Sequence, residues 1–156
     1  MSKQTVYELD EFLVYYSGLF HDIGKSITPL SVLGKEKPLI FDEFSQIKEH
    51  AKLGFRILQE YKFPSEILFA ALLHHEKYDG NGYPIGFKGK EIPLIARIIS
   101  ICDVFDALTS NRPYRKEYTL IEALKIMKDS KEQFDPELLD LFFTKYEEKK
   151  IIKFVV

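Results

Sequence analysis

The hydrophobic residues of this chain recur at intervals of three and four, which is the spacing of one face of an α-helix. In the first segment, Leu9, Phe12, Leu13, Tyr16 and Phe20 follow this spacing. The alternation typical of strands is weak, so the pattern predicts an all-α fold. Helices are predicted over six segments, residues 6–20, 43–60, 64–75, 93–109, 119–128 and 135–148.

Capping residues mark several of the expected helix starts. Asp42 is a candidate N-cap of the second helix, because its carboxylate can accept hydrogen bonds from the first free backbone N–H groups. Pro64 and Pro93 suit the first turns of the next two helices. Thr119, followed three residues later by Glu122, predicts a capping box.

The segments between the helices contain most of the glycine and proline. Residues 26–40 and 76–92 are predicted to be loops, the first with a turn of helix over residues 29–33. Residues 111–115 include a proline and end the helix before them. The apolar residues 151–156 are expected to dock on the core or to add a strand.

The composition narrows the class of protein. The chain has 156 residues, is 46% hydrophobic, has a formal charge of −2 and contains one cysteine. These values favour a single cytoplasmic domain, residues 1–148 with a tail over 149–156, and exclude a disulfide scaffold. The near-neutral charge gives no reason to expect duplex nucleic acid or an anionic membrane as a partner. No apolar run approaches the roughly 20 residues that span a bilayer.

Polar residues on apolar helix faces are the most informative feature. Asp103 lies four residues after Ile99, on one stripe of its predicted helix. A buried carboxylate without a partner is costly, so Asp103 needs a cation, a metal or strong donors. Arg97 and Arg112 are the alternative ion-pair partners.

The four histidines also lie next to apolar residues of predicted helices. His74 and His75 end an apolar helix, His50 lies three residues after Ile47, and His21 directly follows Leu19 and Phe20. Gly54, one turn after His50, leaves room for a second backbone or a ligand. Any one such histidine is more often a hydrogen-bonded core residue than a ligand.

Together, the four histidines with Asp22 and Asp103 indicate a metal site, because helical bundles build such sites from inward-facing His and carboxylate. This donor set suits Fe, Mn or Zn, and more than four protein ligands predict two ions sharing a bridging carboxylate. Lys25 is one helical turn past His21, where its ammonium can reach a phosphate over the metals; alone, it would be taken for a surface lysine. Cys102 is expected to be a small buried apolar residue.

Four motifs resemble the HD-GYP family, a bacterial branch of the HD metal-dependent phosphohydrolases. The likeness runs from about Leu19 to Phe142 without large gaps. An HD dyad alone would be weak, but the order and spacing of all four motifs are specific. The motifs are His21-Asp22-Ile23-Gly24-Lys25, His50 with Gly54, His74-His75-Glu76 continuing to Asp79-Gly80 and Gly82-Tyr83-Pro84, and Asp103 with Asp106 continuing to Arg112-Pro113-Tyr114-Arg115.

The resemblance implies an HD-domain helical bundle with the Gly-Tyr-Pro (GYP) loop between two core helices. It implies hydrolysis of cyclic dinucleotides, chiefly cyclic di-GMP, to the linear dinucleotide pGpG and in many members on to GMP. The cofactor implied is a pair of divalent ions, Fe or Mn. In the family the GYP loop also mediates contacts with diguanylate cyclase (GGDEF) domains.

The resemblance also assigns residue roles. Asp22 is the expected bridging ligand, and it acts in catalysis together with Lys25. The expected metal ligands are His21, Asp22, His50, His74, His75 and Asp103. The expected substrate-binding residues are Lys25, Gly82, Tyr83, Pro84, Arg112 and Arg115.

The chain departs from the family pattern at its start. Family members usually carry one or two further ligands on a helix well before the HD dyad, and only 20 residues precede His21 here. The chain is then either a fragment or a member of a short subgroup. Both explanations predict an exposed apolar groove that favours homo-oligomerisation or docking, lined by the aromatic residues Tyr7, Phe12, Tyr15 and Tyr16.

Three functions remain open at this point. The first is a metal-dependent phosphodiesterase for cyclic di-GMP or a close relative. The second is a catalytically weak module of the same fold that senses cyclic dinucleotides or binds proteins. The third is another HD-type phosphohydrolase acting on nucleotides, against which the GYP loop and residues 112–115 argue.

Overall fold

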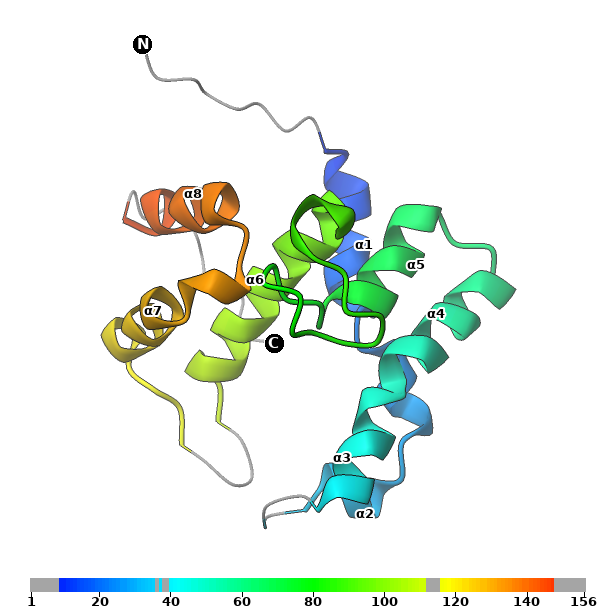
Figure 1. Ribbon diagram of the computed structural model, residues 1–156. Coiled ribbons are helices and arrows are strands. Elements are labelled where there is room, and N and C mark those ends of the chain that lie inside the picture. Colours follow the sequence, from blue (N-terminus) through cyan, green and yellow to red (C-terminus); the bar gives the residue numbers. More distant parts are fainter. Residues whose placement is uncertain (1–8, 36, 38–39, 112–115, 148–156) are drawn as a thin grey trace.

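The computed structural model describes residues 9–35, 37, 40–111 and 116–147 (Figure 1). These residues form α-helices and short 3-10 turns without a strand among them, so the all-α prediction is confirmed. The elements in chain order are α1 (Glu11–Phe20), η1 (Ile23–Ile27), α2 (Leu30–Leu33), α3 (Phe41–Lys48), α4 (His50–Glu60), α5 (Ser65–Leu73), η2 (Gly89–Glu91), α6 (Leu94–Thr109), α7 (Leu120–Asp129), η3 (Lys131–Gln133) and α8 (Pro136–Glu147).

Most of the predicted helix starts are confirmed. Pro64 and Pro93 are the N-cap residues of α5 and α6. At the start of α7, the Thr119 hydroxyl accepts a hydrogen bond from the Glu122 N–H at 3.3 Å, and the Glu122 carboxylate accepts one from the Thr119 N–H at 2.8 Å. The predicted turn over residues 29–33 forms α2, which begins after Pro29.

The helix predicted over residues 43–60 is wrong as a single element, because α3 and α4 divide at Glu49. Nδ1 of the His50 imidazole forms a hydrogen bond with the Ile47 carbonyl at 2.6 Å. A continuous helix would use that carbonyl to accept from the backbone N–H four residues later. Asp42 is also not the N-cap, since α3 begins after Ile40, whose N–H donates to the Glu43 carboxylate at 2.9 Å.

The first helix is shorter than predicted. It begins at Glu11, because the Asp10 carboxylate caps it by accepting from the Phe12 N–H at 2.9 Å. Residues 1–8, which include Tyr7, and residues 148–156 lie outside the described residues. The expectations for the C-terminal tail and for the domain bounds therefore stay predictions.

Helix α6 lies at the centre of the bundle (Figure 1). On one side it packs with α7 and α8 through buried residues that include Ile101, Phe105, Met127 and Leu138. Toward its start, Ile95 and Ile99 pack with Ala70 of α5 and with Val14 of α1. A further apolar cluster, built on Leu58, Ile67, Leu68 and Ala71, joins α4 and α5 to α1. The chemistry described below lies where α1, α4, α5 and α6 meet.

Part of the surface is apolar. Phe12 and Tyr15 on α1 are exposed, whereas Tyr16 is half-buried. Cys102 is also exposed, which corrects the expectation of a buried residue. Among the described residues, none of the helices combines the length and apolar character needed to span a membrane.

Candidate metal centre

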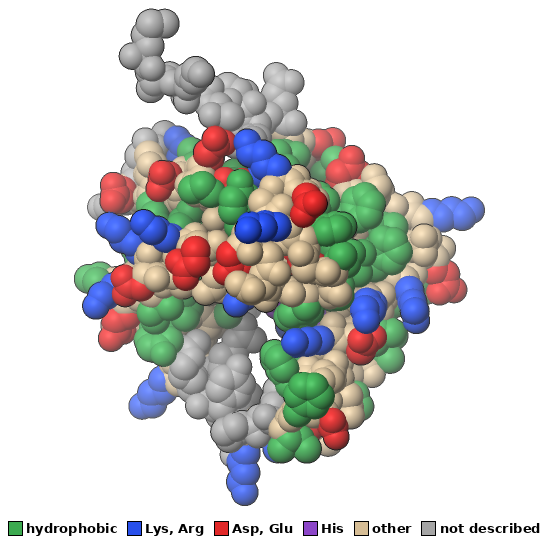
Figure 2. Space-filling model, in the orientation of Figure 1, with side chains coloured by type: hydrophobic (Ala, Val, Ile, Leu, Met, Phe, Trp, Pro, Cys, Tyr) green, Lys and Arg blue, Asp and Glu red, His purple; other side chains and the backbone are tan. Residues whose placement is uncertain are grey.

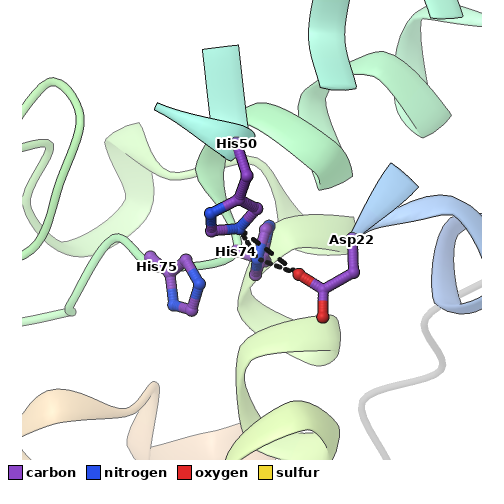
Figure 3. Close-up of side chains that lie close together, drawn as sticks. All are labelled: Asp22, His50, His74 and His75. Atoms are coloured by element: carbon purple, nitrogen blue, oxygen red, sulfur yellow. Dashed lines mark hydrogen bonds and ion pairs between the residues drawn. The ribbon is translucent and has the colours of Figure 1, made fainter. Parts of the chain in front are cut away.

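Three helix ends and the middle of a fourth helix bring the predicted ligands together. His21 is the C-cap of α1 with Asp22 directly after it, His50 is the first residue of α4, and His74 is the C-cap of α5. Asp103 comes from the middle of α6. Figure 3 shows the Asp22 carboxylate facing the rings of His50 and His74, with His75 beside them. The structure brings all four histidines and both aspartates together, and their roles as metal ligands stay a prediction.

Close backbone packing positions the HD dyad. Gly24 in η1 lies against α4, where a Cβ atom on Gly24 would stand 2.6 Å from the Gly54 nitrogen and collide with the His50 carbonyl. Only glycine therefore lets η1 approach α4 so closely at this position. The prediction that Gly54 admits a second backbone is confirmed, and the approach places Asp22 beside His50.

The two oxygens of the Asp22 carboxylate face different histidine nitrogens. Its Oδ1 lies 3.3 Å from His50 Nε2 and 3.7 Å from His74 Nε2, whereas its Oδ2 lies 3.4 Å from His21 Nε2. Asp103 Oδ1 lies 3.6 Å from the same His21 nitrogen. Two sets of donor atoms, each within 4.8 Å of one another, consist of Asp22, His50, His74 and His75 in the first and of His21, His74 and Asp103 in the second.

Backbone carbonyls fix the orientation of three imidazoles. Nδ1 of His21 lies 2.7 Å from the Gly18 carbonyl, and Nδ1 of His50 lies 2.6 Å from the Ile47 carbonyl. Nδ1 of His74 lies 3.0 Å from the carbonyl of Ala71. Because a carbonyl only accepts, Nδ1 of each ring carries a proton, and Nε2 presents a lone pair to the centre whenever the ring is neutral. This is how protein histidines are prepared for metal binding.

The centre is unsatisfied without a cation. His50 Nε2 and His74 Nε2 lie 3.3 Å apart, and in the tautomer set by their carbonyl partners both are acceptors. Asp22 Oδ1 and His21 Nε2 are buried and have no hydrogen-bond partner among the described residues. Facing lone pairs and an unpaired buried carboxylate oxygen are costly alone but are what a metal ion requires. The residues present therefore fit divalent metal ions.

The pKa values of the cluster are strongly displaced. Burial, with the nearby His21, lowers the pKa of His74 to about 4, and burial with the nearby His74 lowers the pKa of His75 to about 3. Burial also opposes charge on His21, but the nearby carboxylates of Asp103 and Asp22 outweigh it and raise the pKa of His21 to about 10. Both aspartates have lowered pKa values, because the nearby His21 outweighs the burial of each carboxylate.

Of the three basic residues predicted to bind substrate, the structure describes one. Lys25 is described, and its ammonium lies 2.5 Å from Asp22 Oδ2. Arg112 and Arg115 lie outside the described residues. The alternative pairing of Asp103 with Arg97 is wrong, because Arg97 forms a salt bridge with Asp135.

The GYP loop closes one side of the cluster. The Tyr83 ring stacks on the His75 imidazole with centroids 4.7 Å apart, and the Tyr83 N–H donates to the His75 carbonyl at 3.2 Å. A Cβ atom on Gly82 would lie 2.5 Å from Glu76 Cα and 2.6 Å from the His75 carbonyl oxygen, so the loop passes here only as glycine. Pro84 follows through a cis peptide bond.

Sequence reasoning missed two residues around the loop. Glu76 is buried, and its carboxylate accepts hydrogen bonds from the Ile85 N–H at 2.7 Å and from the Gly86 N–H at 3.0 Å. A charged residue directly after two inward-facing histidines was the available signal. Lys48, whose ammonium lies 5.0 Å from the centroid of the Tyr83 ring, has no signal in the helical pattern.

A family model described as HD domain matches residues 2–138 of the chain. A cyclic di-GMP phosphodiesterase of Pseudomonas aeruginosa is 39% identical over 127 residues, which are 81% of this chain and 31% of that protein. A 3′3′-cGAMP-specific phosphodiesterase of Vibrio cholerae is 44% identical over 115 residues, which are 74% of this chain and 27% of that protein.

Among solved structures, an HDG"Y"P protein of Bdellovibrio bacteriovorus shares the fold with a TM-score of 0.65 at 23% identity. The match covers 83% of this chain and 43% of that one. The chain spans about a third of the length of the curated relatives it matches.

Proposed function

The chain belongs to the HD domain family, in its HD-GYP branch, and from this premise we propose that it is a metal-dependent phosphodiesterase for cyclic di-GMP. The products would be linear pGpG and, by a second cleavage, GMP. One observation carries the proposal: lone pairs of His50, His74 and Asp22 converge on one point without a donor between them. Relatives named as cyclic di-GMP phosphodiesterases support the choice of substrate.

We assign two divalent ions, Fe or Mn, to the two donor sets. His50, His74 and His75 would hold one ion, and His21 and Asp103 the other. Asp22 suits the bridging position, because its two oxygens face different donor sets. Divalent ions so held polarise a phosphoryl oxygen and make water nucleophilic near neutral pH.

The surrounding residues would orient the substrate. Lys25, fixed against Asp22 Oδ2, places a positive charge beside the metal ligands, where a phosphate oxygen can accept from it. Tyr83 shields His75 on its stacked face and, with Gly82 and Pro84, shapes the wall of the site. Arg112 and Arg115 are proposed to contact substrate phosphate, as the family pattern implies.

A second candidate substrate is 3′3′-cGAMP. The relative that is 44% identical is named for this dinucleotide, and it shares more identical residues per aligned position than the cyclic di-GMP relative described above. Both molecules carry two phosphodiester groups, so the metal cluster acts on them by the same chemistry.

The GYP loop also offers a surface to a protein partner. Ile85, next to Pro84, is 54% exposed although the loop around it is fixed by Glu76. We therefore keep a diguanylate cyclase (GGDEF) domain as a proposed partner, and homo-oligomerisation and a cytoplasmic location as expectations. A non-catalytic module that binds cyclic dinucleotides is the alternative function.

The deciding experiment is turnover by the metal-loaded protein. The protein is reconstituted anaerobically with Fe(II) or Mn(II) and incubated separately with cyclic di-GMP and 3′3′-cGAMP. We expect a linear dinucleotide from at least one of them, lost in Asp103→Asn and kept in the surface control Asp129→Asn. Full metal loading with binding but no product would establish the non-catalytic module instead.

A further inference from the structure

A row of alternating rings and charge runs outward from the metal cluster. It starts at the His75 imidazole, on which Tyr83 stacks with centroids 4.7 Å apart. The Lys48 ammonium follows, 5.0 Å from the centroid of the Tyr83 ring and 4.6 Å from the centroid of the Phe44 ring. Lys48 and Phe44 belong to the last turn and the middle of α3, so this helix contributes a positive charge to the mouth of the site.

Lys48 differs from its neighbours in having no carboxylate partner. Glu43, on the same helix, pairs with Lys35 at 2.6 Å, and Glu49 pairs with Lys52 at 3.0 Å. Lys25 pairs with Asp22 at 2.5 Å. Within the part of the chain that the structure describes, Lys48 forms no ion pair. Its charge is thus left for a ligand, while the acidic groups closest in sequence are already neutralised.

The two rings hold the ammonium in place. A cation within about 6 Å of a ring centroid is attracted to the face of that ring, and here two rings contribute. Such contacts do not consume the three N–H donors of an ammonium group. Lys48 is therefore able to donate to an anionic oxygen from a fixed position. A solvated surface lysine has the same donors but no fixed position.

The helix that carries Lys48 has an exposed apolar surface. Figure 2 shows apolar side chains of the α2–α3 segment facing outward. Leu30 and Phe41 there are more than four-fifths exposed, and Phe44 is 46% exposed. A ligand that reaches Lys48 therefore also meets exposed apolar side chains of α3.

We propose that Lys48, held between Phe44 and Tyr83, binds the phosphodiester that is not being cleaved and so selects substrates with two phosphodiester groups. The inference rests on the proposed function, in which one phosphodiester lies on the metal cluster. In a cyclic dinucleotide the second phosphodiester is carried by the same ring, and its negative charge must lie outside the cluster. Lys25 serves the first group and Lys48 the second.

Two substrates separate this role from a structural one. Cyclic di-GMP carries two phosphodiester groups, whereas bis(p-nitrophenyl) phosphate carries one. For Lys48→Met we expect KM for cyclic di-GMP to rise at least about ten-fold, the effect of losing a charged hydrogen bond, with little change in kcat. The loss in kcat/KM should be at least ten times smaller for the one-phosphate ester. Lys48→Arg should restore much of the affinity, and Lys52→Ala should behave as the unmodified protein.

Binding is measured in parallel, so that the outcome does not depend on turnover. The bis-phosphorothioate analogue of cyclic di-GMP is titrated into the metal-loaded protein, and Lys48→Met should weaken binding about ten-fold and flatten its salt dependence. Unchanged affinity, or equal losses on both substrates, would overturn the role of Lys48. If the unmodified protein binds the analogue through Lys48 but hydrolyses neither substrate, the proposed enzymatic function fails while the role of Lys48 stands.

Discussion

Two groups of charged side chains are enclosed in this bundle, and they differ in how their polar atoms are satisfied. In the first group, Asp135 pairs with Arg97 and accepts from the Glu137 N–H at 2.9 Å, while Arg97 also donates to the Ile92 carbonyl. Glu76, which lines the same cavity of about 10 Å³, accepts from two loop N–H groups.

The second group is the candidate metal centre, where polar atoms face one another. Within the described part of the chain, Asp22 Oδ1 and His21 Nε2 lack a hydrogen-bond partner, and two imidazole nitrogens lie 3.3 Å apart. Both groups are built from carboxylates and nitrogen bases, so residue type alone does not distinguish them. A buried network whose polar atoms are all hydrogen-bonded stabilises the fold, whereas a cluster of buried polar atoms that face one another without partners indicates a binding site.

The largest expected effect comes from removing the carboxylate at the centre. Asp22→Ala should abolish metal retention and lower turnover by at least about 1,000-fold, since the metals supply several kcal/mol of transition-state stabilisation. Metal content by mass spectrometry and product formation by chromatography measure the two effects.

Lys25→Ala is the matched variant, because Lys25 contacts Asp22 but is not a ligand. It should keep both metals and lose rate. Full metal content in Asp22→Ala would show that Asp22 is not the bridge.

In the satisfied group the expected loss is stability rather than chemistry. Asp135→Asn leaves Arg97, whose side chain is 11% exposed, as an unpaired buried charge. We expect the free energy of unfolding to fall by about 3–5 kcal/mol, measured by urea denaturation of the metal-free protein. The exposed Asp140→Asn should stay within about 0.5 kcal/mol. A change in metal stoichiometry in folded Asp135→Asn would break the distinction between the two groups.

Removal of the metal should lower the stability of the fold, because an ion that binds only the folded protein stabilises it. At free metal about 100 times its dissociation constant, binding contributes about 2.7 kcal/mol, so chelation should lower the melting temperature by roughly 5–10 °C. The shift should persist in Asp135→Asn, because distant sites are additive, and vanish in Asp22→Ala. Equal melting curves with and without chelator would indicate that the centre does not bind metal when folded.

A smaller effect is proton release on metal uptake. The pKa of His21 is raised to about 10, so the metal-free protein holds this proton at pH 7.5, and a ligating imidazole must give it up. Metal binding should release about one proton, visible as a dependence of the calorimetric enthalpy on buffer ionisation. Without metal, the same proton stabilises the folded protein below pH 6.5, and that contribution declines as the pH rises toward 10.

His21→Gln is the control for this measurement. It should remove the buffer dependence, because His74 and His75 have pKa values of about 4 and 3 and are already neutral at pH 7.5. Buffer-independent enthalpies for the unmodified protein would contradict the proton assigned to His21.

The sequence predicted those parts of the fold that local rules decide. The starts of α6 and α7 follow from Pro93 and from the Thr119 capping box, and the convergence of the histidines follows from their places on apolar faces. The break at Glu49 was not predictable from periodicity, because it depends on a side chain, His50, taking a backbone carbonyl.

Tertiary contacts decided what the sequence could not. Cys102 lies on an apolar stripe of its helix, yet the packing of the bundle leaves it exposed. The partner of Arg97 proved to be Asp135, 38 residues away, rather than Asp103. The contact of Lys48 with Tyr83 joins α3 to the GYP loop, and no spacing within either segment encodes it.

Anomalous diffraction from Mn(II)-loaded crystals tests the central claim most directly. The account predicts two manganese peaks per chain, one within coordination distance of His50 Nε2 and His74 Nε2 and one beside His21 and Asp103, with Asp22 between them. Crystals equilibrated with Mn(II) that show no peak at this centre, with the His50 and His74 rings still facing each other, would contradict it.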